Sequence, residues 1–99
     1  MNLPDVSSRL AAGFPRTKVA VPCEVRPGAF RSERQFIIRY VGGEEHVGLC
    51  DAMYVSEEHG LVCARIAGVV EGRVKVVVPG NDVVTVRAEE VVERWEGAP

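Results

Sequence analysis

The residues best suited to metal chemistry occur in two segments of the same form, HVGLC (46–50) and HGLVC (59–63). Two imidazoles and two thiolates can hold zinc in a tetrahedral site, with Cys23 as a spare thiolate. However, a strand over residues 46–50 would separate its ends by about 13 Å, too far for two ligands of one ion. We therefore expect buried cysteines, surface histidines and no cofactor. The alternative is a metal-stabilised module with ligands His46, Cys50, His59 and Cys63.

Nucleophilic catalysis has little support in the residue pattern. A cysteine nucleophile needs a nearby base and an electropositive setting. Cys50 instead precedes Asp51 and follows Glu44 and Glu45, so we expect a raised thiol pKa. The serines lie in polar segments, adjacent carboxylates in a strand point to opposite faces, and no phosphate-binding loop is present. We expect a protein that is not an enzyme.

A binding surface is the remaining functional candidate. The segment AFRSERQFIIRY (29–40) interleaves arginines with aromatic residues. Such groups stack on bases and pair with phosphates, and they also anchor protein interfaces. A third interpretation places Phe36, with or without Phe30, in the core and the arginines on a solvated face. The predicted binding residues are Arg26, Phe30, Arg31, Arg34, Arg39 and Tyr40.

Charge and composition bound the possible partners. The chain has 99 residues, 46% hydrophobic and 26% charged, and a net charge of −2. That net charge gives no overall attraction to nucleic acid or anionic lipid. Residues 1–40 carry seven basic and three acidic side chains, whereas residues 41–99 carry five basic and eleven acidic ones. The acidic second part disfavours nucleic acid as the ligand.

The compartment is inferred from the cysteines and the apolar runs. No run approaches the roughly 20 apolar residues of a transmembrane helix, and the N-terminus lacks a signal-peptide pattern. Three cysteines are an odd number and argue against a disulfide scaffold. We expect a cytoplasmic protein with reduced thiols and no membrane partner.

The candidate residues named above are expected to lie on β-strands, which follow an N-terminal segment without a strand pattern. Residues 1–16 are expected to form a short helix or a flexible segment, in which Asp5 caps and Gly13 ends the helix. Residues 17–96 are expected to form one β domain. Its first strand (17–26) alternates, with Val19, Val21, Cys23 and Val25 on one face. Pro22 cannot donate to a ladder, so this strand is predicted to lie at an edge.

Three hairpins are predicted next. The first turns at Gly42-Gly43, which sets Ile38 opposite Val47 and Phe36 opposite Leu49. The second turns at Glu71-Gly72. The third turns at Gly80-Asn81-Asp82 and places a set of valines on one inward face. These valines are Val74, Val76, Val78, Val84 and Val86.

The end of the chain continues with one helical turn at residues 88–90 and a short strand at 91–95. This order over residues 53–95 resembles the closing half of an SH3-like barrel. The predicted fold is therefore all-β: a small SH3-like barrel, or a two-sheet sandwich, built from consecutive antiparallel hairpins. Residues 22–30 and 62–70 are also similar at an offset of 40. Duplication and convergent hairpin patterns both explain that similarity.

These expectations lead to a functional prediction. The preferred one is a non-catalytic interaction module that binds a protein or peptide partner, with self-association through an edge strand as one form of it. The alternative is a small nucleic-acid-binding barrel that uses the arginine and aromatic residues at 26–40.

Overall fold

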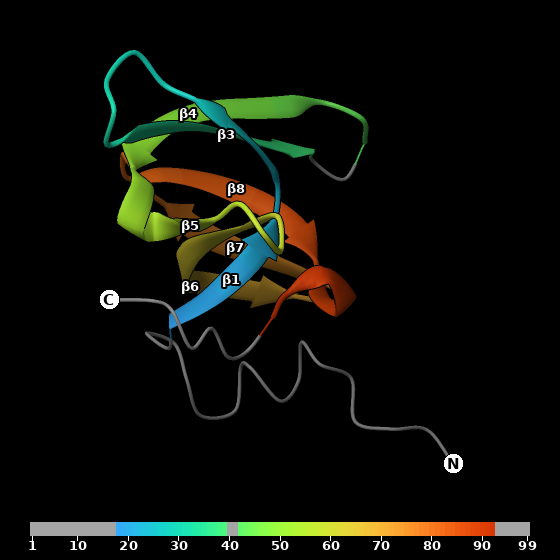
Figure 1. The fold of residues 1–99 in the computed structure, drawn as a ribbon. Helices are drawn as coiled ribbons and strands as arrows, with labels where there is room; N and C mark the ends of the chain where they lie inside the picture. Colours follow the sequence, from blue (N-terminus) through green and yellow to red (C-terminus); the bar gives the residue numbers. More distant parts are fainter. Residues whose placement is uncertain (1–17, 40–41, 93–99) are drawn as a thin grey trace.

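The computed structural model describes residues 18–39 and 42–92, which form eight strands and two single turns of 3₁₀ helix (Figure 1). The chain order is β1 (Lys18–Pro22), β2 (Glu24–Pro27), β3 (Glu33–Arg39), β4 (Glu45–Asp51), η1 (Ala52–Tyr54), β5 (Val55–Ser56), β6 (Leu61–Val70), β7 (Arg73–Val78), β8 (Asp82–Arg87) and η2 (Ala88–Glu90).

The strands form two antiparallel sheets. The five-stranded sheet has the order β1-β6-β7-β8, with β5 also paired to β6, and the three-stranded sheet has the order β2-β3-β4. The all-β prediction is confirmed, and within the described ranges no backbone pairing closes the sheets into one barrel. The helix predicted within residues 1–16 lies outside the described residues.

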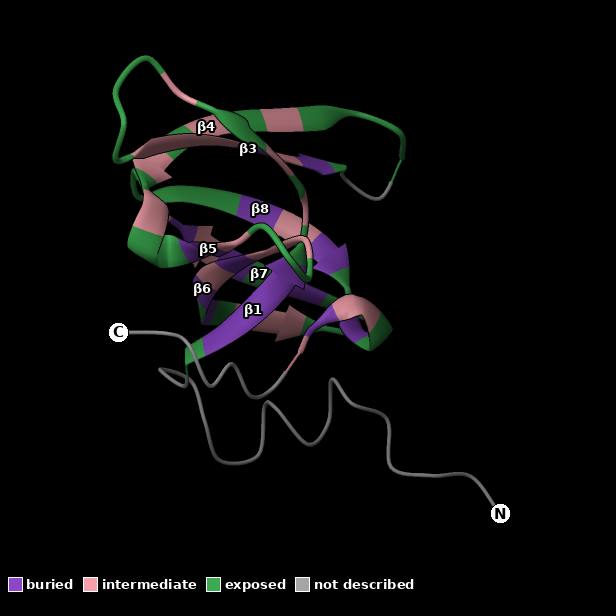
Figure 2. Cartoon of the chain, in the orientation of Figure 1, coloured by how far each residue is buried: buried purple, intermediate pink, exposed green. Residues whose placement is uncertain are grey.

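The hydrophobic core lies between the two sheets, where the buried residues are found (Figure 2). The five-stranded sheet supplies most of it, chiefly as valines. The three-stranded sheet contributes two fully buried side chains, Phe36 and Ile38. Cys23, Val25 and Cys50 pack against this core and are partly buried. Each of these few residues therefore carries a large share of the packing beneath the three-stranded sheet.

The first predicted strand is divided between the sheets, which corrects the prediction of one strand over 17–26. It breaks at Cys23, so that β1 belongs to the five-stranded sheet and β2 to the three-stranded sheet. Both are edge strands, as Pro22 indicated. Alternation fails in β1, where Val19, Ala20 and Val21 are all buried. Ala20 is covered because its other side forms a bridge with Val92.

The β3–β4 hairpin has a different register from the predicted one. Phe36 lies opposite Gly48 and Ile38 opposite His46, a shift of one residue. The reason is space, because a Cβ at Gly48 would overlap the Phe36 ring. A one-residue shift reverses the face of every side chain on a strand. Val47 and Leu49, predicted to be inward, therefore point outward.

The second and third hairpins follow the prediction closely. Val70 pairs with Arg73 around the turn at residues 71–72. The five predicted valines of β7 and β8 are buried on one face, at 2% exposure or less. The third loop is Pro79-Gly80-Asn81 and not residues 80–82, because Asp82 pairs with Val78.

The predicted helical turn at 88–90 is confirmed as η2. Of the strand predicted over residues 91–95, Val91 and Val92 lie within the described residues, Val92 bridges Ala20, and residues 93–95 lie outside them. No helix in the described part of the chain is long and apolar enough to cross a membrane.

Candidate functional site

The predicted arginine and aromatic residues do not meet on one surface. Arg26 and Arg34 lie on β2 and β3, next to the loop that carries Phe30 and Arg31. Arg39 lies at the opposite end of β3, about 17 Å from Arg34 along the strand. Phe30 is 72% exposed and is not a core residue, whereas Phe36 is fully buried. Tyr40 lies outside the described residues.

Two arginines on the outer face of the three-stranded sheet are paired with glutamates. The Arg26 Nη2 atom lies 2.5 Å from Glu24 Oε2, and Arg39 Nε lies 3.8 Å from Glu45 Oε2. Both pairs are largely exposed, so each contributes little to stability. They do reduce the net positive field that a phosphate backbone would meet at this face.

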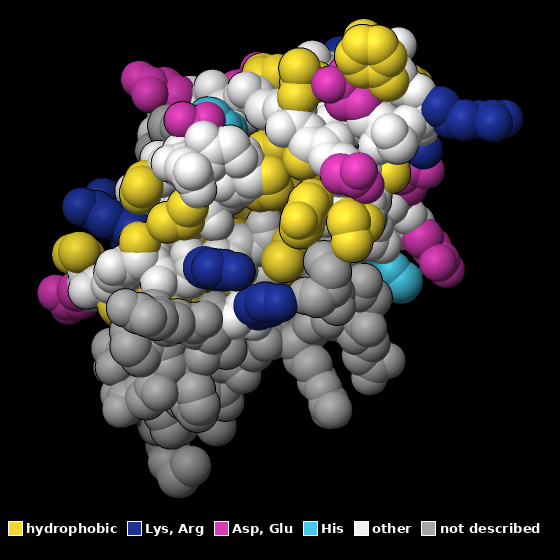
Figure 3. All heavy atoms as spheres, turned by 90° about the vertical axis from the view of Figure 1, so that its left-hand side faces the viewer, with side chains coloured by type: hydrophobic (Ala, Val, Ile, Leu, Met, Phe, Trp, Pro, Cys, Tyr) yellow, Lys and Arg dark blue, Asp and Glu magenta, His cyan; other side chains and the backbone are white. Residues whose placement is uncertain are grey.

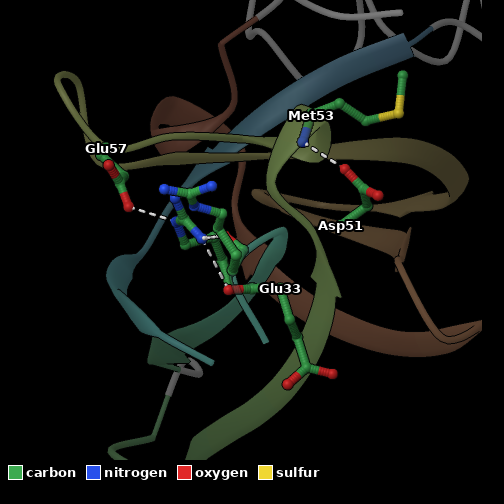
Figure 4. Close-up of polar contacts among 6 residues, drawn as sticks. Glu33, Asp51, Met53 and Glu57 are labelled. Atoms are coloured by element: carbon green, nitrogen blue, oxygen red, sulfur yellow. Dashed lines mark hydrogen bonds and ion pairs between the residues drawn. The ribbon is translucent and has the colours of Figure 1, made fainter. Parts of the chain in front are cut away.

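Arg34 has a structural role that the sequence did not reveal. Its Nε donates to Glu57 Oε1 at 2.6 Å, and its Nη1 donates to the carbonyls of Arg31 and Glu33 at 2.7 and 2.9 Å (Figure 4). This side chain is about three-quarters buried. It therefore ties the loop before β3 to the turn after β5, and its donors are used within the protein.

The cysteines are poorly suited to nucleophilic or metal chemistry. Burial raises the pKa of the Cys23 thiol to about 12, with a further contribution from Cys50. Burial, followed by the charge of Asp51, raises the pKa of Cys50 to about 11. The raised pKa predicted for Cys50 is thus confirmed, although burial and not the neighbouring carboxylate is the main cause. Both thiols are protonated at neutral pH.

The two His-x₃-Cys segments do not converge. In the described part of the chain, no group of three or more His, Cys, Asp and Glu side chains is placed to hold a metal ion. His46 lies on β4, with its ring centroid 6.0 Å from that of Phe36 and its Nε2 3.5 Å from Asp82 Oδ2. His59 lies in the turn after β5, where its Nδ1 is 3.1 Å from Ser56 Oγ. Ser56 Oγ also accepts from the His59 amide, so this contact stabilises a turn.

An apolar strip on the outer face of the three-stranded sheet was not predicted. Val47 and Leu49 of β4 are 53% and 55% exposed, and Ile37 lies directly opposite Val47. We call Ile37, Val47 and Leu49 the apolar strip. The sequence does show hydrophobic alternation in β4, but the predicted register, which was wrong, placed Val47 and Leu49 in the core.

A basic face on the five-stranded sheet was also missed. Arg65, Arg73, Lys75 and Arg87 all alternate with core residues and point away from the core. We call these four residues the basic face. None of them forms an ion pair or side-chain hydrogen bond with another described residue. The alternation of residues 73–87 already indicated that Arg73, Lys75 and Arg87 share one side of the sheet. Their proximity to Arg65 depends on the pairing of β6 with β7.

A hollow of about 730 Å³ adjoins one end of the basic face. Its lining includes Tyr54 of η1, Arg65 and Cys63 of β6, and the loop at 79–81. In Figure 3, a band of hydrophobic side chains crosses the middle of the molecule, with two Lys/Arg side chains directly below it. Lys18 also lines the hollow and is paired in register with Arg65. Burial raises the pKa of the Cys63 thiol, and the charges of Lys18 and Arg65 oppose that shift.

Comparison of the chain with models of protein families, with curated proteins and with solved structures finds no match.

Proposed function

We propose that the protein is a non-catalytic interaction module that binds an extended segment of a partner protein along β4. The observation that carries this proposal is the apolar strip beside an open strand edge. β4 ends the order of its sheet, so one side of its backbone has no strand partner among the described residues. An added strand would gain main-chain hydrogen bonds there, and its alternate side chains would cover Val47 and Leu49.

The charges at the two ends of β4 favour a particular kind of segment. Glu45 and Asp51 are exposed on the same face as the strip, with Val47 and Leu49 between them, and Glu45 also lies 3.8 Å from Arg39 Nε, in an exposed pair that a basic ligand residue can replace. A segment with apolar residues at alternate positions and a basic residue at each end would match both features. A second copy of β4 in antiparallel pairing about Gly48 would instead place Glu45 opposite Asp51 twice. Like charges directly opposite destabilise a pair, so self-association is the weaker form of this proposal.

The proposal also includes the SH3-like architecture. It is supported by the continuity of β1 and β2 at Cys23, which joins the sheets on one side. On another side, His46 of β4 reaches Asp82 at the start of β8. We take the absence of a catalytic role and a cytoplasmic location as parts of the same proposal. The protonated thiols support the first, and the free state of all three cysteines supports the second.

Nucleic acid binding by residues 26–40 is the weaker alternative. The paired Arg26 and Arg39, the internal bonds of Arg34 and the separation along β3 all count against it. Arg31 is the exposed arginine of this segment whose guanidinium forms no ion pair with another described residue. Its replacement by alanine therefore serves as a direct test of this alternative.

The test uses a fluorescent heptapeptide of alternating valine and threonine with lysine at both ends, and its anisotropy is titrated with the full chain. We expect Leu49→Lys to weaken binding by about tenfold or more, because it places a charge in the strip. Val83→Lys is the matched control, since Val83 is 54% exposed but lies on the other sheet. A peptide with glutamate ends should bind more weakly than the lysine peptide.

Two outcomes would overturn the proposal. The first is equal loss of binding in Leu49→Lys and Val83→Lys. The second is equal affinity for the lysine and glutamate peptides. A dimer in sedimentation velocity that Leu49→Lys dissociates would instead support the self-associating form, with a second copy as the occupant of β4.

A further inference from the structure

We propose that the outer face of the five-stranded sheet binds single-stranded nucleic acid through its phosphate backbone. This inference is independent of peptide binding at β4, because it concerns the other sheet and the opposite kind of surface. It rests on the arrangement of the basic face, on the absence of compensating acids within the strands of that sheet, and on the adjoining hollow.

The positive charges of the basic face follow a diagonal across the sheet. Arg65 pairs in register with Val77, Lys75 lies two residues from Val77 on β7, and Lys75 pairs with Thr85, two residues before Arg87. Strand spacing and residue rise place successive charges along Arg65, Lys75 and Arg87 about 8 Å apart. Arg73 lies directly opposite Arg87. A flexible chain with a regular series of negative charges can follow such a line.

At its Arg87 end the basic face adjoins a second hollow, which Glu24, Glu45 and Glu90 also line. The strands of the five-stranded sheet themselves offer no carboxylate to that face. Their one acidic residue, Asp82, lies opposite the buried Val78, and its Oδ2 is 3.5 Å from His46 Nε2. One like-charged pair of the basic face lies directly opposite across neighbouring strands, Arg73 with Arg87. Like charges in direct cross-strand pairs destabilise a sheet. A bound polyanion would offset this repulsion, because its negative charges would lie between the positive side chains.

The arginines favour phosphate as the anion. Three of the four members of the basic face are arginine, whose planar fork binds phosphate oxygens in pairs. The hollow at the Arg65 end presents Tyr54, which is 38% exposed, beside apolar side chains of β6 and β7. A base can stack on such a ring without any particular sequence being required. An acidic protein segment would match the charges but would leave this hollow unused.

The experiment measures the anisotropy of fluorescein-labelled oligo(dT) with the full chain over a series of salt concentrations. Four phosphate contacts predict a slope of log K against log salt near −3, since each contact contributes about −0.7. Arg65→Ala, Lys75→Ala and Arg87→Ala should each weaken binding and flatten the slope by about 0.7. Arg26→Ala is the matched control, because it removes the same charge from the other sheet and should leave the slope unchanged.

Two further arms distinguish the ligand. Tyr54→Ala should weaken oligo(dT) binding, whereas Tyr54→Phe should retain it, because the ring and not the hydroxyl does the stacking. Poly-glutamate of equal charge should compete weakly. Denaturant midpoints of all variants establish that each one folds.

The inference is wrong if oligo(dT) shows no binding at low salt. It is also wrong if the Arg26 control loses as much affinity as the variants of the basic face, since net charge or the alternative surface at residues 26–40 would then explain the binding. Competition by poly-glutamate as strong as that by oligo(dT) would assign the face to an acidic protein segment instead. Because none of these results involves β4, they leave the peptide proposal to its own test.

Discussion

The two sheets present opposite outer faces to their surroundings. On the three-stranded sheet, Arg26 and Arg39 each pair with a glutamate, and the apolar strip lies beside these pairs. On the five-stranded sheet, the four residues of the basic face pair with no other described residue. A count of charges along the chain is therefore a poor guide to its surface. The part of the chain with a net excess of acidic residues supplies the larger basic surface.

The inner faces differ as well. The five-stranded sheet fills the core with many small valines, whereas the three-stranded sheet relies on Phe36 and Ile38. A core of many small contributions tolerates the loss of one, because each valine contributes little. A sheet anchored by two large side chains depends on each of them. This difference leads to three predictions, from the largest effect to the smallest.

Truncation of Phe36 should have the largest effect. Phe36→Ala removes a fully buried ring and leaves a cavity over Gly48, against which the ring packs. It should therefore lower the free energy of unfolding by about 3–5 kcal/mol. Val76→Ala and Val86→Ala, in the five-stranded sheet, should each cost about 1–3 kcal/mol. Urea denaturation followed by circular dichroism measures both. A valine variant that costs as much as Phe36→Ala would contradict the proposed division of the core.

The outward-facing neighbours of these valines provide the control. Lys75→Ala and Thr85→Ala should stay within about half a kcal/mol, because Lys75 is exposed and Thr85 is only partly buried. If Thr85→Ala destabilises as much as Val86→Ala, the outer face is covered in solution. Repeating the measurement at several protein concentrations then shows whether another copy covers it.

Two glycine-to-alanine substitutions, one in each sheet, test how each sheet tolerates one added methyl group. Gly48→Ala should destabilise by about 1–3 kcal/mol, since its Cβ would overlap the Phe36 ring and the core must shift. Gly68→Ala, in β6, meets nothing within 4 Å and requires no positive φ. It should be neutral or slightly stabilising, because alanine restricts the unfolded chain. Equal effects of the two changes would mean that the Phe36 ring moves aside at no cost.

The smallest predicted effect concerns the thiols beneath the three-stranded sheet. Cys23 and Cys50 have pKa values of about 12 and about 11 in the folded protein, against 9.0 as the reference value. Between these values the folded state holds protons that the unfolded state has lost. Stability should therefore fall as the pH rises above 9.0. The Cys23→Ala/Cys50→Ala variant should show a shallower fall in denaturant midpoint, and identical slopes would refute the burial argument.

Much of the fold could be predicted because it depends on neighbours in sequence. The valine alternation of residues 74–86, the turn at residues 71–72 and the single helical turn at 88–90 were all predicted correctly. Each of these patterns is decided within a few residues, by side-chain alternation, by a positive φ at Gly72 or by the end of a strand. The same alternation already separated the outward Lys75 and Thr85 from the buried valines.

The candidate sites depended on contacts between distant residues. Phe36 required Gly48 opposite it, which set the register of β4 and turned Val47 and Leu49 outward. Arg34 was taken for a ligand-binding residue, but Glu57, 23 residues away, binds its guanidinium. No local pattern predicts such a pairing, because either partner alone is compatible with a solvated surface.

Hydrophobic alternation along the chain is enough to specify antiparallel hairpins with a valine core, because it leaves each of those strands one side to bury. Where the surface charges meet depends on how the strands pair in the folded protein. The break at Cys23 sent β1 to one sheet and β2 to the other, which brought Lys18 opposite Arg65. The pairing of β7 with β8 then placed Arg87 opposite Arg73, on the same face as Lys75. Electrostatic fields depend on distance in space, and the folded sheet sets those distances.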